Sequence, residues 1–304
     1  MAHAWMRAII PVAMLYLVLA IASSLAIGMI FKHAGLRGMD AVALLAVNYG
    51  VALVPGIIAA SQQPVDAAAL TPGFWALAVA TGVLFIFGFW IYAKATERAG
   101  LSLAIGVMRI SVVIPFVASW LIWNETPSMA QLLGMGLAGL AFFLIAHKQA
   151  NNASSPTEHA GAPWMQVALL VVLFISGGLV DVALKTFDEV YVSIVGRPIF
   201  LLVLFGVSFL LGMIYVVRRG LQGQWPTRAE IAWGILLGLI NYASVEFLLL
   251  AVEVLSGPFV FPANSIALVI GGALLGVWIW GEHLSARNKV GLGLAAVALL
   301  LLNL

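Results

Sequence analysis

Charged side chains inside long apolar stretches are the residues of this sequence best suited to chemistry. Four of them stand out: Arg109, Asp181, Arg197 and Glu246. Placing a charge in hydrocarbon costs roughly 2.5 kcal/mol or more, so such residues usually have a function. An arginine can hold a carboxylate or a phosphate, and a carboxylate can hold an amine or exchange a proton. These four residues are therefore the first candidates for a polar site.

Some of these charges have a simple local explanation. Asp181 lies four residues before Lys185, which allows an ion pair on one helix face. The alternative is that both contact a substrate and that Asp181 carries a coupling proton. Arg197 lies near the start of an apolar run and precedes Pro198, so its charge can extend to the membrane surface; the alternative is that it has a function inside the span. Arg109 and Glu246 have no such local partner, so we predict that Arg109 binds an anionic substrate group and that Glu246 binds an amine or the coupling proton. Pairing with other buried residues is the alternative for both.

Uncharged polar and aromatic side chains inside the apolar runs extend this candidate site. Those predicted to line a substrate pocket are Asn48, Trp90, Asn241, Tyr242, Asn264 and Ser265. Asn264 and Ser265 follow Pro262, which removes one backbone hydrogen bond and so frees a carbonyl to face a cavity. Hydrogen bonding between helices is the alternative role for each of these residues.

The overall composition indicates what surrounds these residues. Hydrophobic residues make up 63% of the 304-residue chain and charged residues 9%, which predicts an integral membrane protein. The net charge of +2 is small and the basic residues are scattered, which argues against nucleic-acid binding. The chain has no cysteine, and its five histidines lie at run ends or in loops, so we predict no metal and no cofactor. An enzyme is not expected, because the buried acids are isolated in sequence.

Apolar runs of about 20 residues, the length that crosses a bilayer as a helix, divide the chain. We predict an all-α integral membrane protein with ten transmembrane helices, at 9–31, 41–60, 74–94, 101–123, 130–147, 165–187, 191–217, 231–252, 257–280 and 287–304. The polar segment 148–164 is then a linker between a first five-helix repeat at 1–147 and a second at 165–304.

The two halves of the chain repeat one another. The stretch 123–138 matches 280–295 at an offset of 157, with a tryptophan, a glutamate, a serine, two glycines and an alanine in the same order. Five helices per half is an odd number, so the second half enters the membrane from the other side and the predicted repeat has inverted topology. Lys32 and Lys185 match at an offset of 153 and are therefore predicted at opposite faces. There they either attract an anionic substrate or extend to the lipid head groups.

The repeated turns have a structural explanation. Ser128 and Ser285 can cap the helices that follow them. Glu125 and Glu282 precede the same helix starts, where a negative charge suits the positive end of the helix dipole. Small residues that allow the last helices of the two halves to pack closely are Gly134, Gly136, Gly139, Gly291 and Gly293.

Lysine and arginine residues near the spans predict the orientation. Ten lie in odd-numbered loops and two in even-numbered loops or near the termini. The excess of positive charge normally stays in the cytoplasm, so this count places both termini outside.

Two stretches, 92–145 and 241–302, carry a family resemblance. Each contains an apolar helix, a Glu-x-x-Ser turn and a glycine-rich helix. In these stretches and in its ten helices the chain resembles an EamA-like carrier of the drug/metabolite transporter superfamily. The resemblance implies a secondary transporter with alternating access, a central cavity lined mostly by helices 1, 3, 4, 6, 8 and 9, and cytoplasmic termini, contrary to the charge count.

Together, the residues and the resemblance predict a multi-pass protein of the bacterial inner (plasma) membrane. We expect it to export a small polar or amphipathic organic metabolite, with an amino-acid-like solute favoured. The alternative is a flippase for a lipid-linked sugar or head group, with charges near one leaflet. The expected partners are a small-molecule substrate and the lipid bilayer, and the protein is expected to be a monomer or a weak homodimer.

Overall fold

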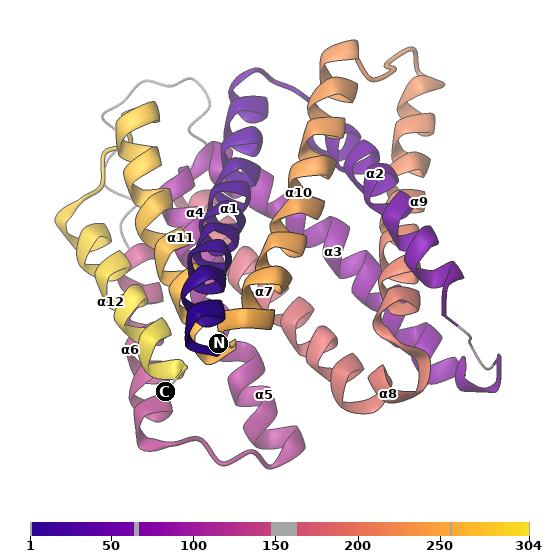
Figure 1. Ribbon diagram of the computed structural model, residues 1–304. Coiled ribbons are helices and arrows are strands. Elements are labelled where there is room, and N and C mark those ends of the chain that lie inside the picture. The colour runs from indigo at the N-terminus through magenta and orange to yellow at the C-terminus, as the bar shows by residue number, and fades with distance from the viewer. Residues whose placement is uncertain (1, 64–66, 147–162, 256, 304) are drawn as a thin grey trace.

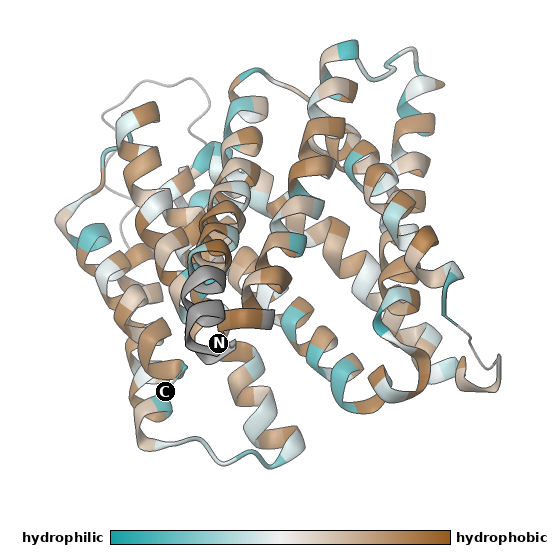
Figure 2. Ribbon diagram, viewed as in Figure 1, coloured by the Kyte–Doolittle hydropathy of each residue, from teal (hydrophilic) through white to brown (hydrophobic). Residues whose placement is uncertain are grey.

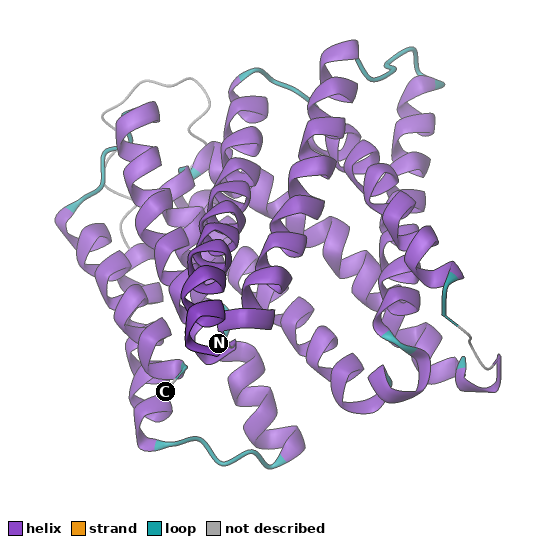
Figure 3. Ribbon diagram, viewed as in Figure 1, coloured by secondary structure: helices purple, strands orange, loops and turns teal. Residues whose placement is uncertain are grey.

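The computed structural model describes residues 2–63, 67–146, 163–255 and 257–303. Within these ranges the protein consists of helices and turns, without a strand (Figure 3), and the predicted all-α class is confirmed. Hydrophobic residues run along most of the helices (Figure 2). The predicted linker at 148–164 falls almost entirely outside the described residues, so the division into two repeats stays a prediction.

Seven elements make up the first half of the chain (Figure 1): α1 Ala2–Leu36, α2 Ala41–Ser61, the 3₁₀ helix η1 Ala67–Ala69, α3 Pro72–Arg98, α4 Leu101–Ile110, α5 Val113–Trp123 and α6 Met129–Ala146. Six helices follow in the second half: α7 Pro163–Val190, α8 Val192–Val195, α9 Arg197–Gly220, α10 Arg228–Leu255, α11 Gly257–Trp280 and α12 Ala286–Leu302. Each of the ten predicted transmembrane segments is helical over most of its length.

Nine helical segments in the described ranges are long and apolar enough to cross a membrane. The last helix, α12, has 17 residues and is one residue shorter than the shortest of these segments. The lengths and apolar character of these helices establish a multi-pass integral membrane protein.

The seventh predicted span starts later than expected. The sequence predicts a start at residue 191, whereas α9 begins at Arg197. Gly196, just before it, has a φ of 79°, a left-handed conformation that favours glycine and separates α9 from the short α8.

The described helix connections lie at two opposite ends of the bundle (Figure 1). One end, called the Glu282 face below, carries the connections 37–40, 99–100, 221–227 and 281–285. The other end, called the Glu125 face, carries the connections 124–128 and 191–196 and the described residues that flank η1.

Helices of the two halves pack against each other throughout the bundle. The main pairs are α1 with α10, α2 with α9 and α10, α3 with α7 and α9, α4 with α11, and α6 with α12. One buried core contains side chains from both halves, among them Phe31, Leu44, Leu101, Leu170 and Leu292. The halves are thus interleaved rather than placed side by side as separate bundles.

Small residues bring α6 and α12 together. A Cβ atom on Gly134 would lie 3.0 Å from α12, and one on Gly291 would lie 2.9 Å from α6. The predicted close packing of these helices is confirmed at both positions. For Gly136, Gly139 and Gly293 the prediction is wrong, because a Cβ atom there would meet open space.

The predicted serine caps are present. Ser128 Oγ accepts a hydrogen bond from the Gln131 N–H at 3.2 Å, and Gln131 Oε1 accepts one from the Ser128 N–H at 2.9 Å. Ser285 Oγ accepts from the Asn288 N–H at 3.2 Å. These bonds satisfy backbone donors at the starts of α6 and α12.

Candidate functional site

The fourth predicted span breaks near its middle, and Arg109 lies at the break. α4 ends at Ile110 and α5 begins at Val113, with a turn between them. Pro115 lacks the N–H that would bond to the carbonyl of Ser111, so the regular helix is interrupted. Broken helices near the bilayer midplane are a common way to build a transport site, because they place polar groups inside the protein.

Arg109 has unused hydrogen-bonding capacity. The side chain is half-buried, and its Nε atom is enclosed without a hydrogen-bond partner. It interacts electrostatically with Tyr92 of α3 and Asp181 of α7, but no ion pair within 4.0 Å joins it to an acid of the described residues. A buried donor without a partner costs about 1–3 kcal/mol, and a charged one more. The guanidinium is therefore able to accept an anionic ligand.

Two glycines let α7 approach this break closely. A Cβ atom on Gly177 would lie 3.0 Å from the Ser111 hydroxyl oxygen, and Gly178 leaves still less room against α5. This approach brings Asp181, one turn further along α7, into electrostatic range of Arg109. Local spacing could not predict this proximity, because the two residues belong to different halves of the chain.

The predicted ion pair between Asp181 and Lys185 is not formed, and that interpretation is wrong. Lys185 Nζ instead lies 2.7 Å from Glu125 Oε1 and 3.4 Å from Glu189 Oε1. The hydrogen bond from Lys185 holds the pKa of the Glu125 carboxyl below its usual value. Lys185 is thus engaged at the Glu125 face, whereas Asp181 lies toward the break in the fourth span.

Arg197 is also engaged at the surface. Its Nε atom lies 3.2 Å from Asp188 Oδ1, and the two side chains are 63% and 48% exposed. This exposed ion pair fits a position near the membrane boundary and does not contribute to the polar site around Arg109.

A pair of asparagines joins α2 to α10. Asn241 Nδ2 donates to Asn48 Oδ1 at 3.3 Å, and Gly238 lets the helices approach. Asn48 is 1% exposed, and its Nδ2 atom has no acceptor. The hydroxyl of the adjacent Tyr49 is likewise buried without a partner. The predicted interhelical hydrogen bond is therefore present. Beside it, the Asn48 Nδ2 atom and the Tyr49 hydroxyl remain available for further hydrogen bonds.

The remaining uncharged candidates lie on α11 and α3. Asn264 is 5% exposed, and its Oδ1 atom has no donor. Ser265 is half-buried, and Pro262 lies inside α11 rather than at a break. Trp90 is half-buried, with its ring centroid 6.0 Å from that of Phe87. The free acceptor of Asn264 makes it the α11 residue best suited to ligand contact.

Tyr242 and Glu246 lie on the exposed side of α10. Tyr242 is 47% exposed and interacts with Glu246, one turn further along. The buried side of the same helix carries Leu237 and Ser244, which lie roughly opposite Glu246 around the helix. The structure therefore does not bring Glu246 to Arg109.

Glu282 contacts the start of α4, and its predicted role at the last helix is wrong. Its Oε1 accepts from the Leu101 N–H at 2.6 Å, and its Oε2 accepts from the N–H and Oγ–H of Ser102 at 3.1 and 2.7 Å. Lys32 Nζ lies 3.3 Å from Oε1. Spacing could not reveal these contacts, since Glu282 follows Leu101 by 181 residues. Gly100, whose φ is 99°, forms the special turn that directly precedes this helix start.

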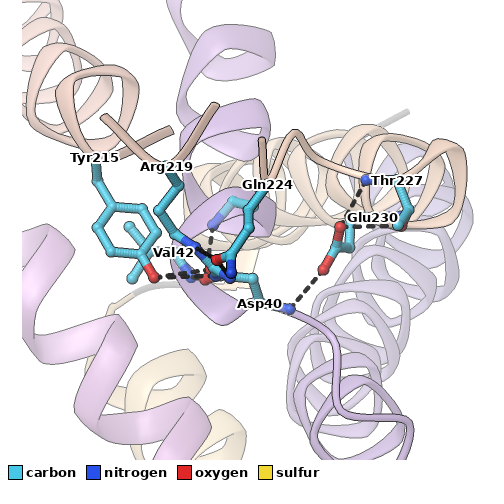
Figure 4. Close-up of polar contacts among 8 residues, drawn as sticks. Asp40, Val42, Tyr215, Arg219, Gln224, Thr227 and Glu230 are labelled. Atoms are coloured by element: carbon cyan, nitrogen blue, oxygen red, sulfur yellow. Dashed lines mark hydrogen bonds and ion pairs between the residues drawn. The ribbon is translucent and has the colours of Figure 1, made fainter. Parts of the chain in front are cut away.

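A second polar cluster at the Glu282 face joins the turn before α2 to α9 and α10 (Figure 4). Asp40 accepts from the Tyr215 hydroxyl at 2.8 Å and forms an ion pair with Arg219. Glu230 accepts from the backbone N–H of Asp40 and from that of Thr227, each at 2.7 Å. Each charged member has a partner, so this cluster holds helices together.

The apolar spans, the broken fourth span and the enclosed polar groups define the class of protein as a multi-pass integral membrane protein with a polar interior. Residues 12–147 match the EamA-like transporter family. The match confirms the resemblance predicted from the sequence, and it implies a membrane transporter of the drug/metabolite transporter superfamily.

Two further similarities bear on the fold. An uncharacterized protein of Haemophilus influenzae is 27% identical over 217 residues, which cover 70% of each chain. A protein of known crystal structure aligns with 96% of this chain and 97% of its own, with a TM-score of 0.54 and 16% identity. The second similarity shows that the fold is shared.

Proposed function

We propose that the protein is a secondary transporter that moves a small polar or amphipathic organic metabolite by alternating access, and that Arg109 binds an anionic group of the substrate. The enclosed Nε atom of Arg109, without a partner at the break in the fourth span, carries this proposal. A carboxylate would supply the missing acceptor, and arginine–carboxylate pairs are among the stronger hydrogen-bonded contacts. Amino-acid-like solutes carry such a carboxylate and are the favoured substrate class.

Asp181 supports a role in coupling. It interacts electrostatically with Arg109 from α7 and is half-buried. An amino-acid-like solute with its carboxylate on Arg109 would place its amine near the Asp181 carboxylate, which binds an amine only when ionised. Substrate and proton then compete for Asp181. Such competition couples an inward-moving proton to an outward-moving solute, which gives export across the inner membrane of a bacterium.

Transport into proteoliposomes tests this proposal. The probe is a panel of labelled amino acids with an imposed pH gradient. Arg109→Gln should reduce uptake roughly 100-fold, because a desolvated charged contact is lost. Arg197→Gln is the matched control and should leave uptake unchanged, since Arg197 pairs with Asp188 at the surface. Asp181→Asn should abolish the dependence on the pH gradient. Undiminished uptake by Arg109→Gln would rule out the proposed site.

The exposed position of Glu246 and Tyr242 favours one second candidate. A flippase for a lipid-linked head group needs polar residues that lipid can reach near one leaflet, and these two side chains lie on the exposed side of α10. A fluorescent lipid-linked sugar in the same vesicles distinguishes the candidates. The flippase would move it and lose that activity in Glu246→Gln, whereas the metabolite carrier would not move it.

A further inference from the structure

Two lysine–glutamate pairs join the halves of the molecule at its opposite faces. Lys32 Nζ of the first half lies 3.3 Å from Glu282 Oε1 of the second. Lys185 Nζ of the second half lies 2.7 Å from Glu125 Oε1 of the first. In the repeat predicted from the sequence, Lys32 matches Lys185 and Glu125 matches Glu282. The same kind of contact is therefore present twice, once at each face.

The two ion pairs differ in how deeply they are buried and in how many further hydrogen bonds the glutamate accepts. The side chains of Lys32 and Glu282 are 10% and 11% exposed, whereas those of Lys185 and Glu125 are 26% and 51% exposed. Glu282 also accepts three hydrogen bonds at the start of α4. The corresponding helix start for Glu125 is that of α11, and no hydrogen bond between them is found among the described residues.

Helix packing shows the same difference. Near the Glu282 face α1 packs on α3, where Gly35 faces Glu97. α4 packs on α11 there, and Ser102 Oγ lies 3.3 Å from the carbonyl oxygen of Gly272. In the described part of the chain the matching helices α7 and α10 make no extensive contact, and α5 packs on α7 rather than on α11. The bundle is therefore more tightly closed at the Glu282 face.

The sequence makes the two helix starts unequal. Glu282 accepts from the N–H of Leu101 and from the N–H and hydroxyl of Ser102. At the matching positions of α11 stand Pro258, which has no N–H, and Phe259, which has no hydroxyl. Of the three donors at α4, the start of α11 offers a counterpart to one. A carboxylate placed there would be held more weakly.

We propose that Glu282 and Glu125 are reciprocal gate residues of the transport cycle. Glu282 closes its face by binding Lys32 and the start of α4. In the opposite state Glu282 leaves α4, and Glu125 moves with Lys185 onto the start of α11. Because α11 offers fewer donors, the resting protein favours the state closed at the Glu282 face. This inference rests on the proposed alternating access but not on the identity of the substrate.

Distances between spin labels measure both gates, and the absence of native cysteine permits site-specific labelling. One pair of labelled cysteines replaces Arg37 and His283, which are exposed at the Glu282 face. The other replaces Thr126 and Val254, which are exposed near the Glu125 gate. Opening of the Glu282 gate lengthens the distance between positions 37 and 283. Closing of the Glu125 gate shortens the distance between positions 126 and 254.

Loss of the Glu282 charge should shift the equilibrium between the two states. In Glu282→Gln we expect the Arg37–His283 pair to gain a longer component and the Thr126–Val254 pair a shorter one, with the ratio of states changed roughly tenfold or more. Glu230→Gln is the matched control at the same face and should leave both distributions unchanged. If neither distance changes in Glu282→Gln, or only the first does, the reciprocal gate is refuted.

A second test strengthens the contact of Glu125 with the start of α11. An unfolded variant could not produce the expected result. Pro258→Leu with Phe259→Ser gives α11 the residues found at the start of α4. We expect this variant to favour the shorter Thr126–Val254 distance at least tenfold over the wild type. An unchanged distribution would contradict the proposal. These measurements need no substrate, so their failure is separate from a failure of Arg109 in the transport assay.

Discussion

The charged side chains at the Glu282 face and the charged side chain of Arg109 near the middle of the bundle differ in whether they have partners. At the face, Lys32 pairs with Glu282, and Asp40 pairs with Arg219 and accepts from a tyrosine hydroxyl. At the break in the fourth span, Arg109 Nε is enclosed without a hydrogen-bond partner. The first group forms networks between helices in which each charge has a partner, whereas Arg109 at the break keeps one donor free.

The difference separates charges that join helices to one another from a charge that is free to bind a ligand. Breaking a complete network leaves charges behind without partners, so it should destabilise the fold. Removing a polar group that has no partner should cost the fold little and should remove ligand binding instead. Substitutions in the two regions therefore predict opposite results for stability and for binding, and the unfolding free energy in detergent micelles is the common measurement.

The largest loss of stability is expected for Glu282→Leu. This change leaves Lys32 without its acid and leaves three donors at the start of α4 without an acceptor. Breaking a buried ion pair on one side costs about 3–5 kcal/mol. Denaturant unfolding should show a loss of that order. A loss below about 1 kcal/mol, the range of exposed pairs, would mean that the network does not hold the face together.

Gly178→Val should give the next largest loss. A side chain at this position would overlap Ile114 of α5 and push α7 away from the break. Overpacking a close contact typically costs 1–3 kcal/mol, so we expect about 2 kcal/mol. Gly139→Val is the control, because a Cβ atom there meets open space. Equal effects of the two changes on unfolding would show that the approach of α7 does not depend on the glycine.

Asn48→Leu should have a smaller effect. It removes the 3.3 Å hydrogen bond from Asn241. Interhelical hydrogen bonds in membranes contribute about 0.6 kcal/mol on average, so a loss near this value is expected. Asn264→Leu is the matched control, since the Oδ1 atom of Asn264 has no donor. It should unfold with the same free energy as the wild type or a higher one.

Glu125→Gln should change stability by less than about 1 kcal/mol, because the pair with Lys185 is exposed and screened by solvent. The hydrogen bond from Lys185 lowers the pKa of Glu125 in the folded state. Its small contribution is therefore present above the usual glutamate pKa and lost as the pH falls through the lowered one. The free energies of unfolding of the wild type and the variant should differ at neutral pH and become equal at acidic pH. A difference that grows in acid would contradict this sign.

The sequence was a good guide to features that depend on composition and local spacing. Apolar runs predicted the helices, Ser128 and Ser285 predicted their own caps, and the turn at 123–128 lies in the region that matches the predicted family. The charge of Arg109 inside an apolar run also identified it as a candidate. Each of these signals lies within a few residues of the feature that it predicts.

Features that depend on contacts between the halves could not be predicted in this way. Glu282 binds a helix start 180 residues earlier in the chain, and Lys185 binds Glu125 rather than the nearby Asp181. The exposed position of Glu246 depends on which side of α10 packs against α1 and α2. A charged residue in an apolar run indicates a free-energy cost of burying the charge. Only the packing of the helices shows whether a partner side chain already offsets that cost.

The smallest loss of stability is expected for Arg109→Leu, which removes an enclosed donor that has no partner. Its effect on ligand binding should be the largest. The most direct measurement is the thermal stability of the purified protein with a panel of carboxylates, amino acids and phosphates, compared between wild type and Arg109→Leu. We predict that a carboxylate-bearing solute raises the melting temperature of the wild type alone, while the two ligand-free proteins melt alike. A solute that stabilises both equally would contradict the assignment of Arg109 as the substrate-binding residue.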